Sequence, residues 1–374
     1  MKFLAREKTV LQRYSPKLED NLQQLGLLSL EGENSQCMKI FKQHGAVRLL
    51  LPSQYGGNNA SALDALFYQL SLGSLAPSLA IATTMHQYKV ATLVEMARNR
   101  DLSTLLDRVC SQNMLIASGG SEGNTGGNLF YPTMTATDTE TGLLINGTKR
   151  PCCMTWSMDI LSVLLVTDKN SKYEGELVNV IIDASDPSIH RSKFWNNRFL
   201  SAAESDAITL VNTEVSDENV FRVGTPNNSK EFATSAFLWF ELLATGSYLG
   251  MAARLIEILI EEKKASAADI TSLDMMYSSQ LAALEYVANR MDAGENVSED
   301  LLARILKIRY ATQDAIATIS TRAMETLGGL GFVKSDEISM LVMSCRGLMF
   351  HPPGRKTMQK NLLHYMETGE LTLA

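Results

Sequence analysis

The spacing of apolar residues divides the chain into three zones, and the first is helical. From Lys2 to about Met114, Leu, Ala, Met and Gln recur every three or four residues, which predicts helices. Turn signals interrupt this pattern at 51–59 (LPSQYGGNN) and at 75–78 (LAPS). We therefore expect an N-terminal helical domain over residues 1–114.

The second zone, residues 115–225, has a sequence pattern typical of β-strands. Short runs rich in β-branched and aromatic residues alternate with turn clusters such as TDTETG, DKNSKYEG and DASDPS. The predicted strands fall in FYPTMTAT, GLLING, ILSVLLVT, ELVNVIID and DAITLVNTEV. We expect a β domain here, between two helical zones.

The third zone, residues 226–374, is helical again. Its three longest segments begin near ATSAFLW, SLDMMYS and SEDLLAR, and each is long enough for a bundle helix. Ser298, followed by two acids, is a plausible N-cap, and Gly328-Gly329 a plausible helix stop. Helices, strands and helices in this order predict an α+β protein.

One residue of the third zone suggests chemistry. The 22 residues between Glu231 and Arg254 carry a single charge, Glu241. Burial raises a carboxyl pKa, and a raised pKa suits a general base. Glu241 could equally lie on a solvated face or in an ion pair. The stretch is long enough to span a membrane, but its Ser, Thr and Gly residues lower its hydrophobicity, and Glu241 would be costly in a bilayer. We therefore expect a core helix and no membrane partner.

Composition narrows the class of protein. The chain has 374 residues, 45% hydrophobic and 20% charged, with a net charge of −7. This acidic balance argues against a nucleic-acid partner. The N-terminus lacks an uninterrupted apolar run, so we expect a cytoplasmic protein without a secretory signal. Five scattered cysteines indicate neither a disulfide framework nor a metal site.

Five motifs in order make the chain resemble the acyl-CoA dehydrogenase superfamily. They are a P-x-x-Y-G-G turn, a T-E-P-x-x-G-S loop, an I-N-G-x-K hairpin, a V-P-x-x-N-V turn and an L-G-G-x-G-[FY] turn. Their counterparts here lie at 51–57, 121–127, 145–149, within 201–221 and at 327–332. The resemblance implies an N-terminal helical domain, a central β-barrel or sandwich and a C-terminal four-helix bundle.

The resemblance also implies FAD as cofactor and oxidation of an acyl thioester. In that chemistry a carboxylate removes the α-proton while a hydride leaves to flavin, and the protein positions both partners. Glycine-rich backbone near the second motif can approach the cofactor closely. The implied cofactor-binding residues are Gly119, Ser121, Gly126, Gly127, Cys153, Glu325, Gly328 and Gly329.

The chain departs from the family at the catalytic base. The usual Glu of a C-terminal E-G-T motif is replaced by Pro353. A minority of the family carries its base on the first long bundle helix, before an A-G-x-x-G turn. Counting back from Gly250 places Phe240 there, and Glu241 one residue later. The resemblance thus leaves Glu241 as the expected catalytic base.

Other departures touch the flavin contacts. The flavin-stacking Trp becomes Pro151, the Thr two positions on becomes Cys153, and the Gln before the last turn becomes Glu325. Trp156 could supply the missing ring, although a packing role is the alternative. His86 lies near a family position in the acyl pocket, and a hydrogen-bonded core histidine is the competing interpretation.

A divergent site of this kind resembles the branch that oxidises groups on carrier proteins. It implies a prolyl or acyl thioester on the phosphopantetheine of a carrier protein, and a homodimer or homotetramer. Basic residues near the entrance would attract an acidic carrier protein; the candidates are Lys149, Arg150, Arg191, Lys193 and Arg198, and a solvated surface charge is the competing interpretation for each. An acyl-CoA dehydrogenase of secondary metabolism, a flavin monooxygenase and a flavin-free, non-catalytic homologue remain alternatives.

Overall fold

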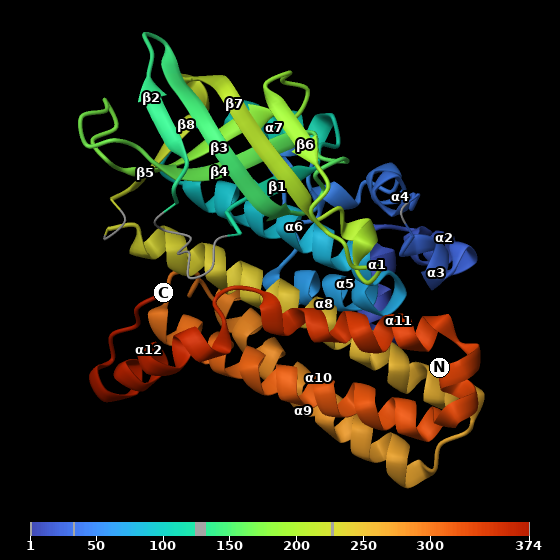
Figure 1. The fold of residues 1–374 in the computed structure, drawn as a ribbon. Helices are drawn as coiled ribbons and strands as arrows, with labels where there is room; N and C mark the ends of the chain where they lie inside the picture. The colour runs from blue at the N-terminus through green and yellow to red at the C-terminus, as the bar shows by residue number, and fades with distance from the viewer. Residues whose placement is uncertain (1, 33, 124–131, 226–227, 374) are drawn as a thin grey trace.

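The structure, a computed structural model, describes residues 2–32, 34–123, 132–225 and 228–373, and it has the α+β architecture that the resemblance implies. Helices form two groups with the strands stacked against one side of them (Figure 1). The N-terminal helices are α1 (Ala5–Tyr14), α2 (Leu18–Leu25), α3 (Leu27–Leu30), α4 (Cys37–Gln43), α5 (Ala62–Leu75), α6 (Pro77–Met96) and α7 (Ser103–Ser111), with 3₁₀ turns at Ala46–Arg48 and Ser53–Tyr55.

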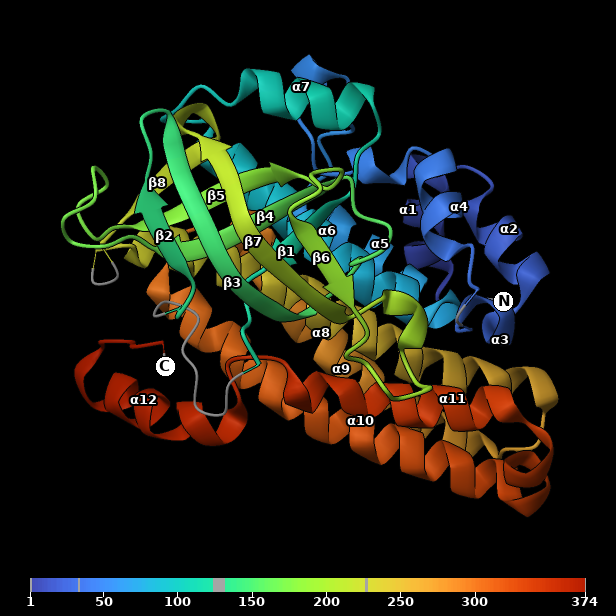
Figure 2. The ribbon, with the colours of Figure 1, turned by 45° about the horizontal axis from the view of Figure 1, so that its top comes forward.

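The strands form two four-stranded sheets. The first has the order β1-β4-β5-β8 and the second β2-β3-β7-β6. Strands β3 and β7 are the long central strands of the second sheet, and Figure 2 shows them face-on. The bounds are β1 Ile116–Gly119, β2 Thr135–Asp138, β3 Gly142–Cys152, β4 Ile160–Val166, β5 Leu177–Asp183, β6 Ile189–Ser192, β7 Asp206–Ser216 and β8 Val220–Gly224, with 3₁₀ turns at Ser201–Ala203 and Asp217–Asn219.

The I-N-G-x-K motif lies in a β-hairpin, as the resemblance implies, because Ile145 and Asn146 of β3 pair antiparallel with Ala136 and Thr135 of β2. Gly147 has a φ of 144° and sits at a register shift where β3 pairs with β7. A positive φ of this kind favours glycine, and an irregular step bends the strand without ending it. The run therefore continues to Cys152 and carries the chain to the site described below.

The C-terminal zone forms a helical bundle around one buried helix. Its elements are α8 (Lys230–Glu262), α9 (Ala267–Asp292), α10 (Glu299–Lys334), α11 (Asp336–Ser344), a 3₁₀ segment at Cys345–Phe350 and α12 (Arg355–Thr368). Helix α8 packs against α5, α6, α9 and α10. It is long and apolar enough to cross a membrane, yet most of its apolar window is buried inside the protein, as in a core helix.

Helix α10 begins where the sequence predicts, but it extends beyond its predicted end. The Ser298 hydroxyl accepts a hydrogen bond from the Leu301 N–H at 3.2 Å, which confirms the N-cap. Gly328, with φ 72° and ψ 178°, ends the first helical run as predicted, but a second helical run follows directly across a kink and extends to Lys334. The kink lies at the end of the bundle away from α12 (Figure 1).

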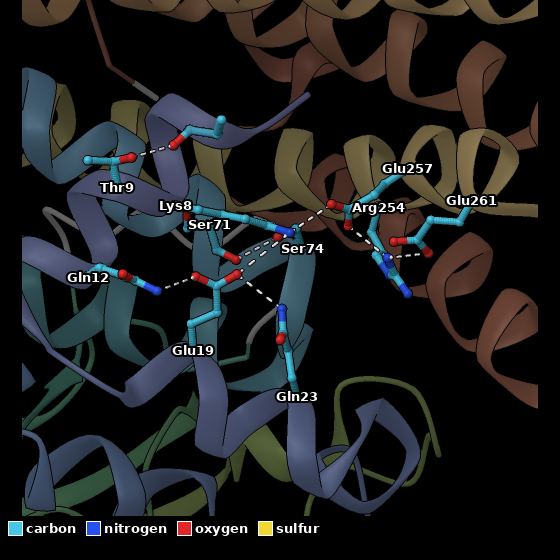
Figure 3. Close-up of polar contacts among 11 residues, drawn as sticks. Lys8, Thr9, Gln12, Glu19, Gln23, Ser71, Ser74, Arg254, Glu257 and Glu261 are labelled. Carbon is cyan, nitrogen blue, oxygen red and sulfur yellow. Dashed lines mark hydrogen bonds and ion pairs between the residues drawn. The ribbon is translucent and has the colours of Figure 1, made fainter. Parts of the chain in front are cut away.

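A polar network fastens the first two helices to the bundle (Figure 3). The Lys8 ammonium lies 2.7 Å from a Glu257 oxygen on α8 and 3.7 Å from Glu19 on α2. Arg254 pairs with the other Glu257 oxygen at 2.7 Å and with Glu261 at 3.1 Å. Glu257 is almost fully buried, so its two cationic partners compensate the cost of removing a carboxylate from water.

Candidate active site

A cavity of about 280 Å³ lies where α6, β1, the end of β3, α8 and the segment after α11 meet. Most of its wall is apolar, with polar groups in two places. The lining residues are Ile81, Met85, Tyr88, Lys89, Ser118, Gly120, Ser121, Pro151, Cys153, Leu164, Trp195, Leu200, Ala203, Ser205, Phe232, Ala233, Ala236, Phe237, Phe240, Tyr248, Gly347, Phe350, His351 and Pro352.

The first polar region contains two of the predicted cofactor-binding residues. Ser121 follows β1 and Cys153 follows β3, and both line the cavity. The Cys153 sulfur lies 3.0 Å from the Ser205 hydroxyl, while the Tyr88 hydroxyl hydrogen-bonds to Ser118. The two motif positions therefore line one cavity, although they are 32 positions apart in the sequence.

A lysine that the sequence did not single out lies on this same wall. Lys89 is 6% exposed and lines the cavity. Burial, and then the nearby Lys149 ammonium, lower the pKa of Lys89 to about 8. Its contact with the neighbouring Tyr88 ring, 5.6 Å from Nζ to the centroid, is a cation–π interaction.

Lys149 has a different environment from the one expected of a carrier-binding residue. Its side chain is 1% exposed, and its ammonium lies 2.9 Å from Glu122. The other Glu122 oxygen accepts from the Thr133 N–H at 2.7 Å and the Thr133 hydroxyl at 2.6 Å. Lys149 and Glu122 thus fasten both ends of the segment that follows β1, and the prediction of Lys149 as a surface contact is wrong.

The rest of the lining is mainly aromatic and aliphatic. Ile81 and Met85 project from α6, and Phe237 and Phe240 from α8. The Phe240 ring packs edge-on to Tyr88 with centroids 5.6 Å apart. These side chains recur every three or four residues, which places them on one face of each helix.

The second polar region is a tyrosine–histidine pair. The Tyr248 hydroxyl lies 2.9 Å from His351 Nε2, and both residues line the cavity. Burial, and then the charge of Arg309, lower the pKa of His351 to about 3, so the ring is neutral at pH 7. A Cβ at Gly347 would lie 2.4 Å from the Tyr248 hydroxyl oxygen, so a side chain there would displace Tyr248.

Glu241, the predicted base, is buried in an ion pair and does not line the cavity. Arg309 on α10 donates to its two oxygens at 2.8 and 3.0 Å, and both side chains are fully buried. Burial raises the pKa of Glu241 to about 7, and Arg309 opposes this by stabilising the carboxylate. One residue step turns a helical side chain by about 100°, so Phe240 faces the cavity and Glu241 faces α10.

Arg309 connects this ion pair to the histidine. Its guanidinium also donates to the backbone carbonyls of Leu348, His351, Pro352 and Pro353. The Tyr310 hydroxyl adds a 2.8 Å bond to the Pro353 carbonyl. Glu241 holds Arg309, and Arg309 holds the 348–353 segment, which presents His351 to the cavity. Catalysis by Glu241 stays a prediction, while the geometry gives it a positioning role.

Other predicted residues lie apart from the cavity. Glu325, Gly328 and Gly329 are at the kink of α10, at the end of the bundle away from α12 (Figure 2), and none of the three lines the cavity. Gly119 lies in β1 beside the wall, and Gly126 and Gly127 lie outside the described residues. Flavin contact by any of these residues stays a prediction.

Trp156 and His86, the candidates for the flavin-stacking ring and for the acyl pocket, both lie outside the cavity lining. Trp156 is 49% exposed and donates from Nε1 to Asp206 at 2.7 Å, so it neither lines the cavity nor packs in the core. Trp195 lines the cavity instead. His86 is the buried, hydrogen-bonded core histidine of the competing interpretation: Nδ1 accepts from the Ile116 N–H and Nε2 bonds the Val47 carbonyl, both at 3.0 Å.

The residues that line the cavity fit an isoalloxazine ring. Such a ring is planar, with an apolar benzenoid half and a polar pyrimidine half. The cavity has aromatic and aliphatic walls, and near Ser121 it has serine hydroxyls and a buried lysine. When bound, a flavin would supply the redox chemistry that these side chains do not have.

Comparison with known proteins agrees with this assignment. No protein-family model matches the chain. Isobutylamine N-hydroxylase of Streptomyces viridifaciens is 35% identical over 381 residues, covering 100% of both proteins. This similarity extends over all three zones of the chain.

Solved structures share the fold at low sequence identity. FMN-bound TdsC from Paenibacillus sp. A11-2 has a TM-score of 0.81 at 16% identity and covers 100% of this chain and 99% of that one. The FAD complex of PigA has a TM-score of 0.79 at 16% identity, covering 99% and 98%. The prolyl acyl carrier protein oxidase AnaB has a TM-score of 0.81 at 17% identity, covering 97% and 99%.

Motif order, fold, cavity and full-length similarity converge. The chain belongs to the family of isobutylamine N-hydroxylase, within the acyl-CoA dehydrogenase-like flavin-dependent oxidoreductases.

Proposed function

We propose that the protein is an FAD-dependent monooxygenase that hydroxylates the nitrogen of a small aliphatic amine. One atom of dioxygen adds to the amine nitrogen, the other leaves as water, and reduced flavin supplies two electrons. The full-length similarity to isobutylamine N-hydroxylase supports this reaction class. The prediction of FAD agrees with the FAD-bound relative of the same fold.

The observation that carries the proposal is the chemistry of the cavity wall. Among the described residues that line it, none is Asp or Glu. Removal of an α-proton from a thioester needs a base in reach of the substrate, and Glu241 is held by Arg309 outside the lining. N-hydroxylation needs no carboxylate at the carbon skeleton, because the nitrogen lone pair accepts the oxygen.

The side chains explain how an amine would be bound. Tyr248 and His351 are neutral, so they can hydrogen-bond an uncharged nitrogen. The Lys89 ammonium disfavours a second cation in a cavity of low polarity. The site therefore selects the unprotonated amine, the form whose lone pair is free, while Phe237 and Phe240 pack against its alkyl group and exclude water.

The test is an oxygen-labelling assay. Purified protein is supplied with FAD, a flavin reductase, NADH, isobutylamine and ¹⁸O₂, and the product is analysed by mass spectrometry. We expect a hydroxylamine that carries one ¹⁸O. Flavin oxidation that yields only hydrogen peroxide, with isobutylamine and with a series of C3–C6 primary amines, would contradict the proposal.

A second candidate is oxidation of a prolyl thioester on a carrier protein. Its support is the shared fold with AnaB and the presence of Glu241 on α8. Here Glu241 would have to leave Arg309 and reach the cavity. Anaerobic mixing of the oxidised flavoprotein with a prolyl-carrier thioester separates the candidates, because a dehydrogenase bleaches the flavin without oxygen and an N-hydroxylase does not.

A further inference from the structure

The buried amine of Lys89 has no anionic partner in the described part of the chain. Among those residues its Nζ makes no hydrogen bond or ion pair, and the Tyr88 ring is its one cation–π partner. A buried ammonium is costly unless an opposite charge compensates it. The cavity wall that it lines thus lacks one negative charge.

Neighbouring charges do not supply that compensation. Lys149, the closest cation, is itself neutralised by Glu122 at 2.9 Å. The Cys152 thiol nearby is neutral because burial raises its pKa strongly. With no carboxylate in the described lining and His351 neutral, the described lining carries the net positive charge of Lys89.

We propose that Lys89 binds the anionic ring of reduced flavin and so makes the site prefer the reduced cofactor. The oxidised ring is neutral, whereas the reduced ring carries a negative charge on its pyrimidine half near neutral pH. Lys89 lines the same cavity as Ser121 and Cys153, the positions that the family resemblance assigns to flavin, and it interacts electrostatically with Cys152, which precedes Cys153. The inference rests on the proposed function only in placing flavin in this cavity.

The preference has a consequence for the reaction. An enzyme that consumes reduced flavin has to capture it in competition with the oxidised form. A charge that acts on only one redox state gives this selectivity without any contact to the amine. Lys89 is therefore a positioning and selectivity residue for the cofactor.

The test measures affinities and needs no turnover. Dissociation constants of oxidised FAD and of dithionite-reduced FAD are determined anaerobically for the wild type, Lys89→Met, Lys89→Arg and Lys360→Met. The flavin phosphates are the same in both redox states, so the ratio of the two constants isolates the ring. Lys360 is an exposed lysine of α12 and controls for the change in net charge.

We expect the wild type to bind reduced FAD more tightly than oxidised FAD. Lys89→Met should weaken reduced FAD about tenfold or more and leave oxidised FAD unchanged, which lowers the bound-flavin potential by about 30 mV per tenfold. Lys89→Arg and Lys360→Met should keep the wild-type ratio.

Other outcomes overturn the inference in distinct ways. Equal weakening of both forms would assign Lys89 to a phosphate or to folding. A Lys89→Met variant with the wild-type ratio of dissociation constants would contradict the contact between Lys89 and the reduced ring. A wild type that binds both redox states equally would contradict it too, and this measurement holds even if the variant does not fold. A wild type that binds neither form would reject the proposed function as well.

Discussion

At the residue scale, the most informative contact is the one between Glu241 and Arg309. The two residues are 68 positions apart and fully buried, and together they fix the segment that carries His351. A positioning role and a catalytic role make different predictions for stability. Removing one partner of a buried ion pair leaves the other charge without compensation.

Glu241→Gln tests this difference. If the pair is structural, the variant loses about 3–5 kcal/mol of unfolding free energy, because the Arg309 charge is left unpaired. Urea denaturation measures this loss. The matched control is Glu261→Gln on the same helix, a half-exposed partner of Arg254 that should change stability by less than about 1 kcal/mol. A Glu241→Gln variant as stable as this control yet without turnover would instead favour the catalytic base.

His86 gives a prediction for pH. Burial lowers its pKa to about 4, whereas an unfolded histidine titrates near 6.5. On acidification the unfolded state therefore takes up a proton at a higher pH than the folded state does. The folded state has its full stability with respect to His86 above about pH 6.5, and it loses stability as the pH falls towards 4. From pH 7.5 to 5 the loss amounts to about 2 kcal/mol, and His351 acts in the same direction.

Urea midpoints at pH 7.5 and 5 measure this dependence. His86→Gln should be less stable at pH 7.5 but lose less stability on acidification than the wild type. His364→Gln, at an exposed position of α12, should keep the wild-type pH dependence. An identical acid loss in His86→Gln and the wild type would show that His86 does not control it.

At the scale of elements, the crossing of α5 and α8 sets the position of the cavity wall. A Cβ at Gly73 would lie 2.0 Å from the Ser247 carbonyl oxygen, and a Cβ at Gly250 would lie 2.0 Å from that of Leu70. Both contacts are with backbone, which cannot rotate away. Only glycine lets the two helices approach this closely, and this approach brings α8 with Tyr248 to its place.

Gly73→Ala is the corresponding prediction. Although alanine favours a helix intrinsically, the overlap forces the helices apart and should cost about 1–3 kcal/mol. Thermal unfolding followed by circular dichroism measures the change. Gly329→Ala is the control, since a Cβ there meets nothing within 4 Å; a Gly73→Ala variant that melts with this control would show that the crossing tolerates a side chain.

The elements also show what the sequence could and could not predict. Long periodic runs predicted α8, α9 and α10, and alternating runs predicted most strands. β1, β6 and β8 have only four or five residues, too few for a clear period, and were missed; β2 is equally short and was found only as the end of the longer run FYPTMTAT. Ser121 and Cys153 were found through local motifs. Lys89, Tyr248 and His351 carry no local signal, because only the packing of α6, α8 and the 348–353 segment brings them to one cavity.

At the scale of the whole molecule, the kink of α10 has a notably apolar surface. Leu330, Phe332 and Val333 are 71%, 59% and 77% exposed beside Gly328. Exposed apolar clusters on soluble proteins commonly mark interfaces. The family resemblance assigns flavin contacts to this same kink, although the kink is far from the cavity of its own chain. In an oligomer, the kink of one subunit could contact flavin bound in the cavity of another.

We therefore predict a homodimer or homotetramer in which this kink contacts another subunit. The double variant Leu330→Lys/Val333→Glu should lower the mass measured by analytical ultracentrifugation and weaken FAD binding. Leu28→Lys, on an exposed apolar position of α3, should change neither. A wild type that sediments as a monomer at micromolar concentration would contradict this assembly.

The composition of the cavity wall has a consequence for how this protein can diversify. The wall takes residues from α6, the strands and their connections, α8 and the segment before α12, so no single stretch of the gene encodes the pocket. A chimaera that receives only residues 230–262 from a relative would acquire new aromatic rings, while the lysine and the serines of the lining stay unchanged. Substrate range and cofactor selectivity can therefore evolve separately, whereas transplanting the whole activity requires exchange of nearly the entire chain.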